Sequence, residues 1–232
     1  MARDKVLVIV NKGSTHGVTT QVEQDVFATL FGVNRGDQSI MHDLSWHTKY
    51  YDARYDLYID THNDSLQQWM LEFNDEQCTE LRGALAGVVI LHSQYDESVA
   101  QMLDTQGIFA IWMNDSEETD QDAIDDINME LAAGDSSLEV VRLDNDNRNN
   151  DFGEAVGLAR AREIIDTYPW EGMTQHKEPD TSQTPKEQDM EAIVSLLNNA
   201  RQRYSSLQNS DSTEAKEFAE GMADELARKL GV

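Results

Sequence analysis

The pattern of apolar and polar positions divides the first 170 residues into strands separated by helices. Four short runs are mostly apolar and rich in β-branched residues, which is typical of strands buried on both faces. They are Lys5–Val10, Ala84–His92, Ile108–Met113 and Leu138–Leu143. Two further runs, Leu44–Tyr51 and Arg54–Thr61, alternate apolar and polar residues. Only Asp52 and Ala53 separate them, a gap too short for a crossover helix, so we expect an antiparallel hairpin.

Between the strands, apolar residues recur every three or four positions, which predicts amphipathic helices. The predicted helices are Gln21–Phe31, Leu66–Leu81, Ser98–Asp104, Asp120–Ala133 and Phe152–Tyr168. Strands that alternate with helices indicate α/β architecture, with a mixed, mostly parallel sheet and helices on both faces. An antiparallel pair inserted after the first helix is the order of a Ras-like small G-protein fold, so we expect a G-protein-like domain over residues 1–170. A flavodoxin-like sheet would place a helix between those two strands.

The remaining residues predict a separate, smaller part of the chain. Residues 171–185 hold two prolines among Gly, Thr, Ser and Gln, which is typical of a linker. Residues 186–232 predict a C-terminal helical hairpin with one apolar stripe on each helix. Because such a hairpin cannot bury enough apolar surface alone, it must dock on the main domain, form a homodimer or bind a partner. The candidate partner-binding residues are Met190, Ile193, Leu197, Tyr204, Phe218, Met222, Leu226 and Leu230.

Composition narrows the classes of partner. The chain has 18 Lys and Arg against 44 Asp and Glu, a net charge of -26. Such a surface is repelled by phosphate backbones and anionic lipids, so we expect no direct contact with nucleic acid. The acidic run Glu117–Asp126 is either the solvated face of its helix or a surface for a basic partner. No apolar stretch approaches the ~20 residues of a membrane span, and the N-terminal apolar run is a strand rather than a signal peptide, so we expect a cytosolic or nuclear protein.

The loop after the first strand carries the candidate chemistry. A P-loop needs Gly, four residues, then Gly-Lys-Ser/Thr, since its N–H groups cradle phosphates and its lysine neutralises them. Counted from Gly17, the first glycine position holds Lys12 and the lysine position holds Val18, while Thr19 fits the hydroxyl that binds metal. This predicts a pseudoGTPase. An ordinary strand-to-helix turn and a vestigial anion site are alternatives.

Binding of a phosphate-containing ligand is the alternative function. In one version of this alternative, the protein is a weak GTPase. Residues 14–19 also match the Thr/Ser-x-Thr-Gly-x-Thr loop of flavodoxins except at His16, so an FMN binder using the Gly13–Thr19 loop is the other version. Asp60 stands near the magnesium position of a GTPase, and Asn114 follows a strand where guanine recognition would use Asn-Lys-x-Asp. Both also fit polar strand ends. His16, His62 and His92 could meet at the strand ends, but no ligand spacing unites them, and no metal site, cofactor site or catalytic residue is assigned.

Three long stretches resemble one family. They are Tyr50–Asp60 (YYDARYDLYID), Asp151–Thr167 (beginning DFGEAVGLAR and ending EIIDT) and Phe218–Leu226 (FAEGMADEL). Together they resemble the fungal increased recombination centers protein six family, which is similar to the animal alpha- and gamma-adaptin-binding protein. The resemblance covers nearly the whole chain.

This resemblance implies a G-protein-like domain without nucleotide motifs, followed by a small helical domain. It also implies a non-enzymatic role as a clathrin adaptor accessory protein or assembly chaperone in vesicle-mediated transport. The implied partners are clathrin adaptor complex subunits, and contact with Rab-type GTPases is an open alternative. The family name refers to a recombination phenotype, and the net charge of -26 argues against direct DNA contact.

Overall fold

The structure is a computed structural model that describes residues 3–13, 17–63, 65–116, 119–143 and 153–176. The chain divides into two units, Met1–His176 and Lys177–Val232, and all described residues belong to the first. The eight predicted partner-binding residues, from Met190 to Leu230, therefore lie outside the described residues, as does the predicted helical hairpin.

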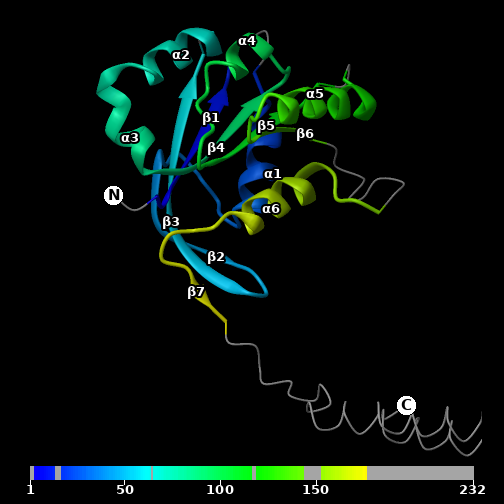
Figure 1. Ribbon diagram of the computed structural model, residues 1–232. Helices are drawn as coiled ribbons and strands as arrows, with labels where there is room; N and C mark the ends of the chain where they lie inside the picture. The colour runs from blue at the N-terminus through cyan, green and yellow to red at the C-terminus, as the bar shows by residue number, and fades with distance from the viewer. Residues whose placement is uncertain (1–2, 14–16, 64, 117–118, 144–152, 177–232) are drawn as a thin grey trace, which may run out of the picture. The chain divides into compact units, whose positions relative to one another are not determined.

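The described residues form a seven-stranded mixed sheet in the order β2-β3-β1-β4-β5-β6, with β7 paired to β3 (Figure 1). The strands are β1 (Lys5–Asn11), β2 (Ile40–His47), β3 (Tyr51–His62), β4 (Leu85–His92), β5 (Phe109–Asn114), β6 (Leu138–Arg142) and β7 (Thr174–Gln175). The pairs β3–β1, β1–β4, β4–β5 and β5–β6 are parallel, while β2 and β7 run antiparallel to β3. The predicted antiparallel hairpin within a mostly parallel sheet is confirmed.

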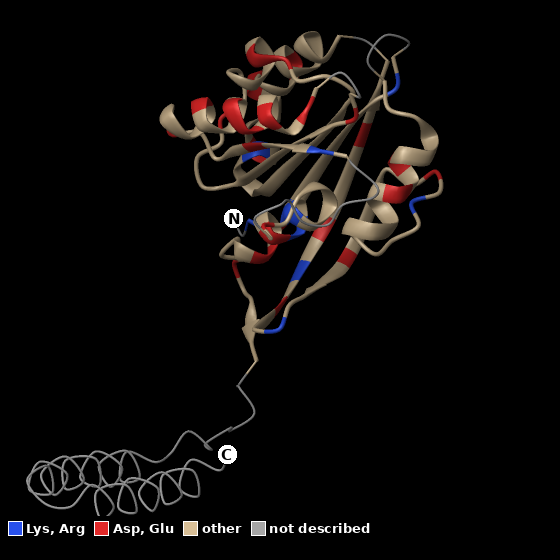
Figure 2. Ribbon diagram, turned by 90° about the vertical axis from the view of Figure 1, so that its right-hand side faces the viewer, with Lys and Arg blue, Asp and Glu red and all other residues tan. Residues whose placement is uncertain are grey.

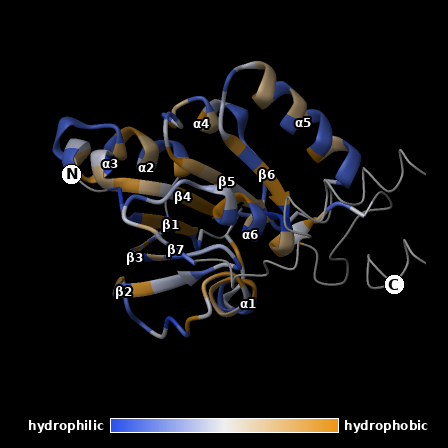
Figure 3. Ribbon diagram, turned by 60° about the horizontal axis from the view of Figure 1, so that its bottom comes forward, coloured by the Kyte–Doolittle hydropathy of each residue, from blue (hydrophilic) through white to orange (hydrophobic). Residues whose placement is uncertain are grey.

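Helices cover both faces of this sheet. They are α1 (Thr20–Leu30), α2 (Leu66–Phe73), the 3₁₀ turn η1 (Glu76–Cys78), α3 (Thr79–Ala84), α4 (Glu97–Ala100), α5 (Gln121–Ala133) and α6 (Gly157–Thr167). One core lies under α1 and α6 and a second lies under α2, α4 and α5 (Figure 1). The strands β1, β4 and β5 are almost wholly buried, as their continuous apolar runs predict, and they form the apolar centre in Figure 3.

The predicted turn at Asp52 and Ala53 is wrong, because both residues belong to β3. The chain turns between His47 and Tyr51 instead. There the Thr48 hydroxyl accepts the N–H groups of Tyr50 and Tyr51, at 3.1 Å and 3.0 Å. Such hydrogen bonds from the backbone to a side chain stabilise turns. Thr48 lies within an alternating run that predicts a strand, so the residue pattern shows no clear sign of a turn there.

Three predicted helices are shorter by several residues in the structure. The helix predicted over Ser98–Asp104 is α4, Glu97–Ala100, which ends four residues earlier. The helix predicted over Leu66–Leu81 breaks after Phe73, where the Asp75 carboxylate accepts the Gln77 N–H at 3.0 Å and starts a new turn. The helix predicted from Phe152 begins only at Gly157. Gly153 has a φ of 81°, which is not a right-handed helical conformation.

The first residues of the predicted linker extend the sheet. Thr174 and Gln175 form β7, which pairs with Asp52 and Tyr51 at the start of β3. Because β1 reaches β3 only from Asp56 onward, the start of β3 offers free backbone groups on that side. Among the described residues, no helix combines the length and apolar character needed to cross a membrane.

Candidate functional site

In the loop after β1, backbone N–H groups donate hydrogen bonds to oxygen atoms of the protein itself. Lys12 N–H donates to the His62 carbonyl at 2.8 Å, and Gly13 N–H donates to the Asn11 side-chain oxygen at 2.7 Å. Gly17 N–H donates to the Gly13 carbonyl and Val18 N–H to the Asn11 carbonyl, both at 2.9 Å. These four N–H groups are therefore bonded within the protein, and two of them, those of Gly17 and Val18, stand at positions whose N–H groups a P-loop directs at a phosphate.

The tight path of this loop explains its second glycine. A Cβ at Gly17 would lie 2.3 Å from the Gly13 carbonyl oxygen and 2.7 Å from the Lys12 carbonyl carbon. Both are backbone atoms, so no side-chain rotation could relieve the clash. Glycine is required at position 17 for close packing of the loop against itself, whether or not an anion binds.

Val18 and Thr19 have structural partners in place of phosphate and metal. The Val18 side chain is 4% exposed and lies in the core under α1 and α6. The Thr19 hydroxyl accepts the Val22 N–H at 3.2 Å and so caps α1. Val18, at the position of the P-loop lysine, is thus a core residue. The Thr19 hydroxyl, which fits the metal-binding hydroxyl of a P-loop, instead caps the N-terminus of α1.

A buried carboxylate ties the segment between α1 and β2 to the same loop. Glu23, on α1, is 7% exposed and forms ion pairs with both Lys12 and Arg35. The Arg35 guanidinium also donates to the Thr61 hydroxyl at 2.8 Å and lies 5.7 Å from the Phe27 ring centroid. These bonds hold residue 35 against β3 and α1 at the place where a phosphate-sensing segment would need freedom to move.

The other strand-end candidates also make internal contacts. The Asp60 carboxylate accepts the Trp69 indole N–H at 2.8 Å and so fixes α2 to the end of β3. Asn114 is fully buried, and its side-chain oxygen accepts the Ser116 N–H at 3.0 Å. His62 and His92 are both buried, whereas His16 lies outside the described residues. No group of three or more His, Cys, Asp or Glu side chains suited to a metal occurs in the part of the chain that the structure describes.

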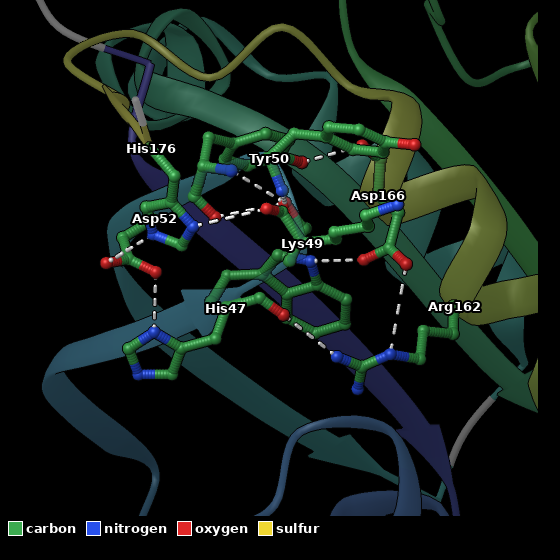
Figure 4. Close-up of polar contacts among 10 residues, drawn as sticks. His47, Lys49, Tyr50, Asp52, Arg162, Asp166 and His176 are labelled. Carbon is green, nitrogen blue, oxygen red and sulfur yellow. Dashed lines mark hydrogen bonds and ion pairs between the residues drawn. The ribbon is translucent and has the colours of Figure 1, made fainter. Parts of the chain in front are cut away.

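A second polar cluster joins the hairpin, β7 and α6 at the other end of the sheet (Figure 4). Asp52 lies between two imidazole rings, 2.8 Å from His47 Nδ1 and 2.9 Å from His176 Nε2. His176 also donates its backbone N–H to the Tyr50 carbonyl at 2.8 Å, and its Nδ1 lies 3.3 Å from the Lys49 carbonyl oxygen. The hydrogen bond to Asp52 raises the pKa of His176, and the bonds from His176 and His47 lower the pKa of Asp52.

Aromatic side chains anchor this hairpin to α6. The Trp46 indole donates to the Asp166 carboxylate at 2.7 Å, and the Tyr51 hydroxyl donates to the Asp166 carbonyl at 2.7 Å. The Arg162 guanidinium lies 4.8 Å from the Trp46 ring centroid, a cation–π contact. These contacts fasten the β2–β3 hairpin to α6. Figure 4 shows Arg162 and Asp166 of α6 facing the hairpin.

Sequence reasoning placed the candidate loop correctly and missed both ion-pair clusters. Glu23 lies within the predicted helix Gln21–Phe31, and an acidic residue four positions after Thr19 on a largely buried face is the sequence signal that points to this cluster. His176 stands within the predicted linker, and no local pattern pairs it with Asp52. Pairing across 124 positions depends on the sheet, which periodicity does not reveal.

Curated relatives match nearly the whole chain. Increased recombination centers protein 6 of Zygosaccharomyces rouxii is 33% identical over 231 residues, which is 98% of this chain and 94% of that protein. The protein of the same name from Saccharomyces cerevisiae (strain ATCC 204508 / S288c) is 32% identical over 243 aligned residues, covering 98% of each chain. No protein-family model matches the chain.

A solved structure is also similar. It is described as the crystal structure of yeast Irc6p, a novel type of conserved clathrin accessory protein. The two chains are 26% identical with a TM-score of 0.65, and the match covers 76% of this chain and 98% of that one. The similarity extends over nearly all of both curated relatives, which confirms the resemblance predicted from the three stretches. This chain therefore belongs to the Increased recombination centers protein 6 family.

Proposed function

We propose that this protein is a non-enzymatic, cytoplasmic accessory protein of clathrin coats, which binds clathrin adaptor complex subunits and assists their assembly in vesicle-mediated transport. The observation that carries the proposal is the likeness to yeast Irc6p, which is described as a clathrin accessory protein and is matched over 98% of its solved chain. Contact with a Rab-type GTPase and a homodimer through the C-terminal helices are further parts of the proposal.

The domain organisation in this proposal has three parts. In it, residues 1–170 are a Ras-like pseudoGTPase domain, 171–185 a linker whose Thr174 and Gln175 pair with β3, and 186–232 a helical domain with partner-binding stripes. The sheet order, with one antiparallel strand pair inserted after α1, supports the Ras-like assignment. The internal bonds of Gly13, Gly17 and Val18 favour a binding function over the alternative of GTP or FMN binding at this loop.

The test is direct binding of the purified full chain to recombinant adaptor large and small subunits. We expect saturable binding that Leu197→Asp or Leu226→Asp weakens, because a charge on an apolar contact stripe must be desolvated on association. Asn199→Asp, which adds the same charge off the predicted stripe, serves as the matched control. Absence of adaptor binding by the wild-type chain would refute the coat function. Wild-type affinity in both leucine variants would refute only the assignment to residues 186–232.

The rival ligand function has its own measurement. Calorimetric titration of the full chain with Mg²⁺–GTP and with FMN should give no saturable heat. Val18 stands where a P-loop has lysine, and His16 stands where the flavodoxin loop has a hydroxyl residue. Saturable binding of either ligand would restore the phosphate-ligand function for the Gly13–Thr19 loop.

A further inference from the structure

A groove with an apolar floor lies between α4 and α5, away from the loop after β1. Its volume is about 640 Å³. The two helices are neighbours on one face of the sheet in Figures 1 and 3. The groove is bounded by the segment from residue 95 to residue 106 on one side and by the C-terminal half of α5 with residues 134–136 on the other.

Half-buried apolar side chains form the floor of this groove. Tyr95, Ile127 and Leu131 line it and pack against the core beneath, which includes the buried lining residue Leu103. The Tyr95 ring stands edge-on to Trp112, with centroids 5.2 Å apart. Because the floor rests on packed core side chains, the hollow is part of the folded domain and does not need to open before it can receive an apolar side chain.

The rim of the groove is acidic. Glu97, Asp104, Glu130 and Asp135 all line it and are all exposed, and no Lys or Arg is among the described residues that line it. Burial raises the pKa of the Tyr95 hydroxyl, and the carboxylates of Glu97 and Glu130 raise it further, as expected where the local potential is negative. Figure 2 shows acidic residues gathered on the upper helices, which include α5.

These features specify the chemistry of an occupant. An apolar floor accepts one or two aliphatic or aromatic side chains, and four carboxylates around it favour Lys or Arg beside them. Nucleic acid has the wrong charge for such a rim, and an acidic peptide would be repelled by it.

We propose that the groove between α4 and α5 is a docking site for a basic amphipathic segment of a partner protein, with apolar side chains on its floor and Lys or Arg at its carboxylate rim. The proposal does not require the coat function, because it rests on the groove alone.

The test uses the full chain and a synthetic probe. The probe is a helical peptide of about 12 residues made of leucine and lysine, with leucines three and four positions apart, and the comparison peptide has glutamate at every lysine. We expect saturable binding of the lysine peptide and none of the glutamate peptide by calorimetry at low salt. Equal binding of both peptides would overturn the proposal, since the rim would then make no contribution.

Paired variants locate the binding. Glu130→Lys with Asp135→Asn removes rim charge, and asparagine suits position 135 because φ there is 56°. Asp122→Lys with Glu171→Gln changes the net charge by the same amount at residues that do not line the groove. The rim variant should bind the lysine peptide at least about tenfold more weakly, and the control within about twofold of wild type. Equal weakening in both variants would place the effect in the overall charge and overturn the site.

Two further measurements separate loss of binding from loss of folding, and a partner segment from a second copy of this chain. Glu130→Gln alone, a milder change, should weaken binding less than the double rim variant while preserving the thermal unfolding midpoint. Sedimentation of the wild-type chain addresses a second copy as occupant. Self-association that the rim variant abolishes would overturn the proposal in favour of that occupant.

Discussion

Val18→Lys restores the missing lysine of the P-loop, and we expect it to destabilise the protein without creating a nucleotide site. The valine side chain is 4% exposed and packs in the core under α1 and α6. Full burial of a valine contributes roughly 1.5–3 kcal/mol, and a lysine stem recovers part of this only if its ammonium reaches water. We therefore expect the free energy of unfolding to fall by about 2–3 kcal/mol.

Urea unfolding followed by tryptophan fluorescence measures this change, since Trp46, Trp112 and Trp170 are buried in the fold. Val18→Ala is the control for lost side-chain volume. Its free energy of unfolding should fall by about 1.6 kcal/mol, because two buried methylene equivalents are removed. Calorimetry with Mg²⁺–GTP then tests for a gain of binding. A Val18→Lys protein that is as stable as wild type and binds GTP would refute the reasoning, because the N–H groups of Gly17 and Val18 would then be available to phosphate.

Two further predictions concern the ion-pair clusters. Glu23→Gln should lower the free energy of urea unfolding by about 2–3 kcal/mol, less than for a fully buried pair because Lys12 and Arg35 keep some exposure. Asp25→Asn on the same helix is its control, and equal losses would show that Glu23 has no special role. Asp52→Asn should lower the pKa of His176 measured by NMR titration, since Asp52 raises it. The His176–Asp52 contact should weaken as pH rises through the raised pKa of His176 and as pH falls through the lowered pKa of Asp52. An unchanged pKa of His176 would show that the pair does not form in solution.

The element order could be predicted because it depends on local periodicity. The apolar runs of β1, β4 and β5 are continuous since both faces of these strands are covered, and the antiparallel hairpin follows from a short gap between alternating runs. Element boundaries were less accurate where a single polar side chain decides them. Asp75 starts a new turn after the break in one predicted helix, and Thr48 moves the hairpin turn. Both act through hydrogen bonds to nearby backbone groups.

Only some properties of the candidate loop could be predicted from the sequence. The absence of a lysine at Val18 predicted that phosphate chemistry is lost, and the three matching stretches predicted the family that the relatives confirm. That Gly17 serves close packing, and that Thr19 caps α1, required coordinates, because the same residues could also have surrounded an anion.

Sequence by itself therefore determined the α/β element order, the strong negative charge and the family of this protein. Only the tertiary structure decided which charges meet. Glu23 holds Lys12 and Arg35, and Asp52 holds His176 across 124 positions. It also decided that Tyr95 and Leu131 share one acid-rimmed groove. The physical reason is that helix and strand periods arise from neighbouring residues, whereas ion pairs and grooves arise where the sheet brings distant segments together.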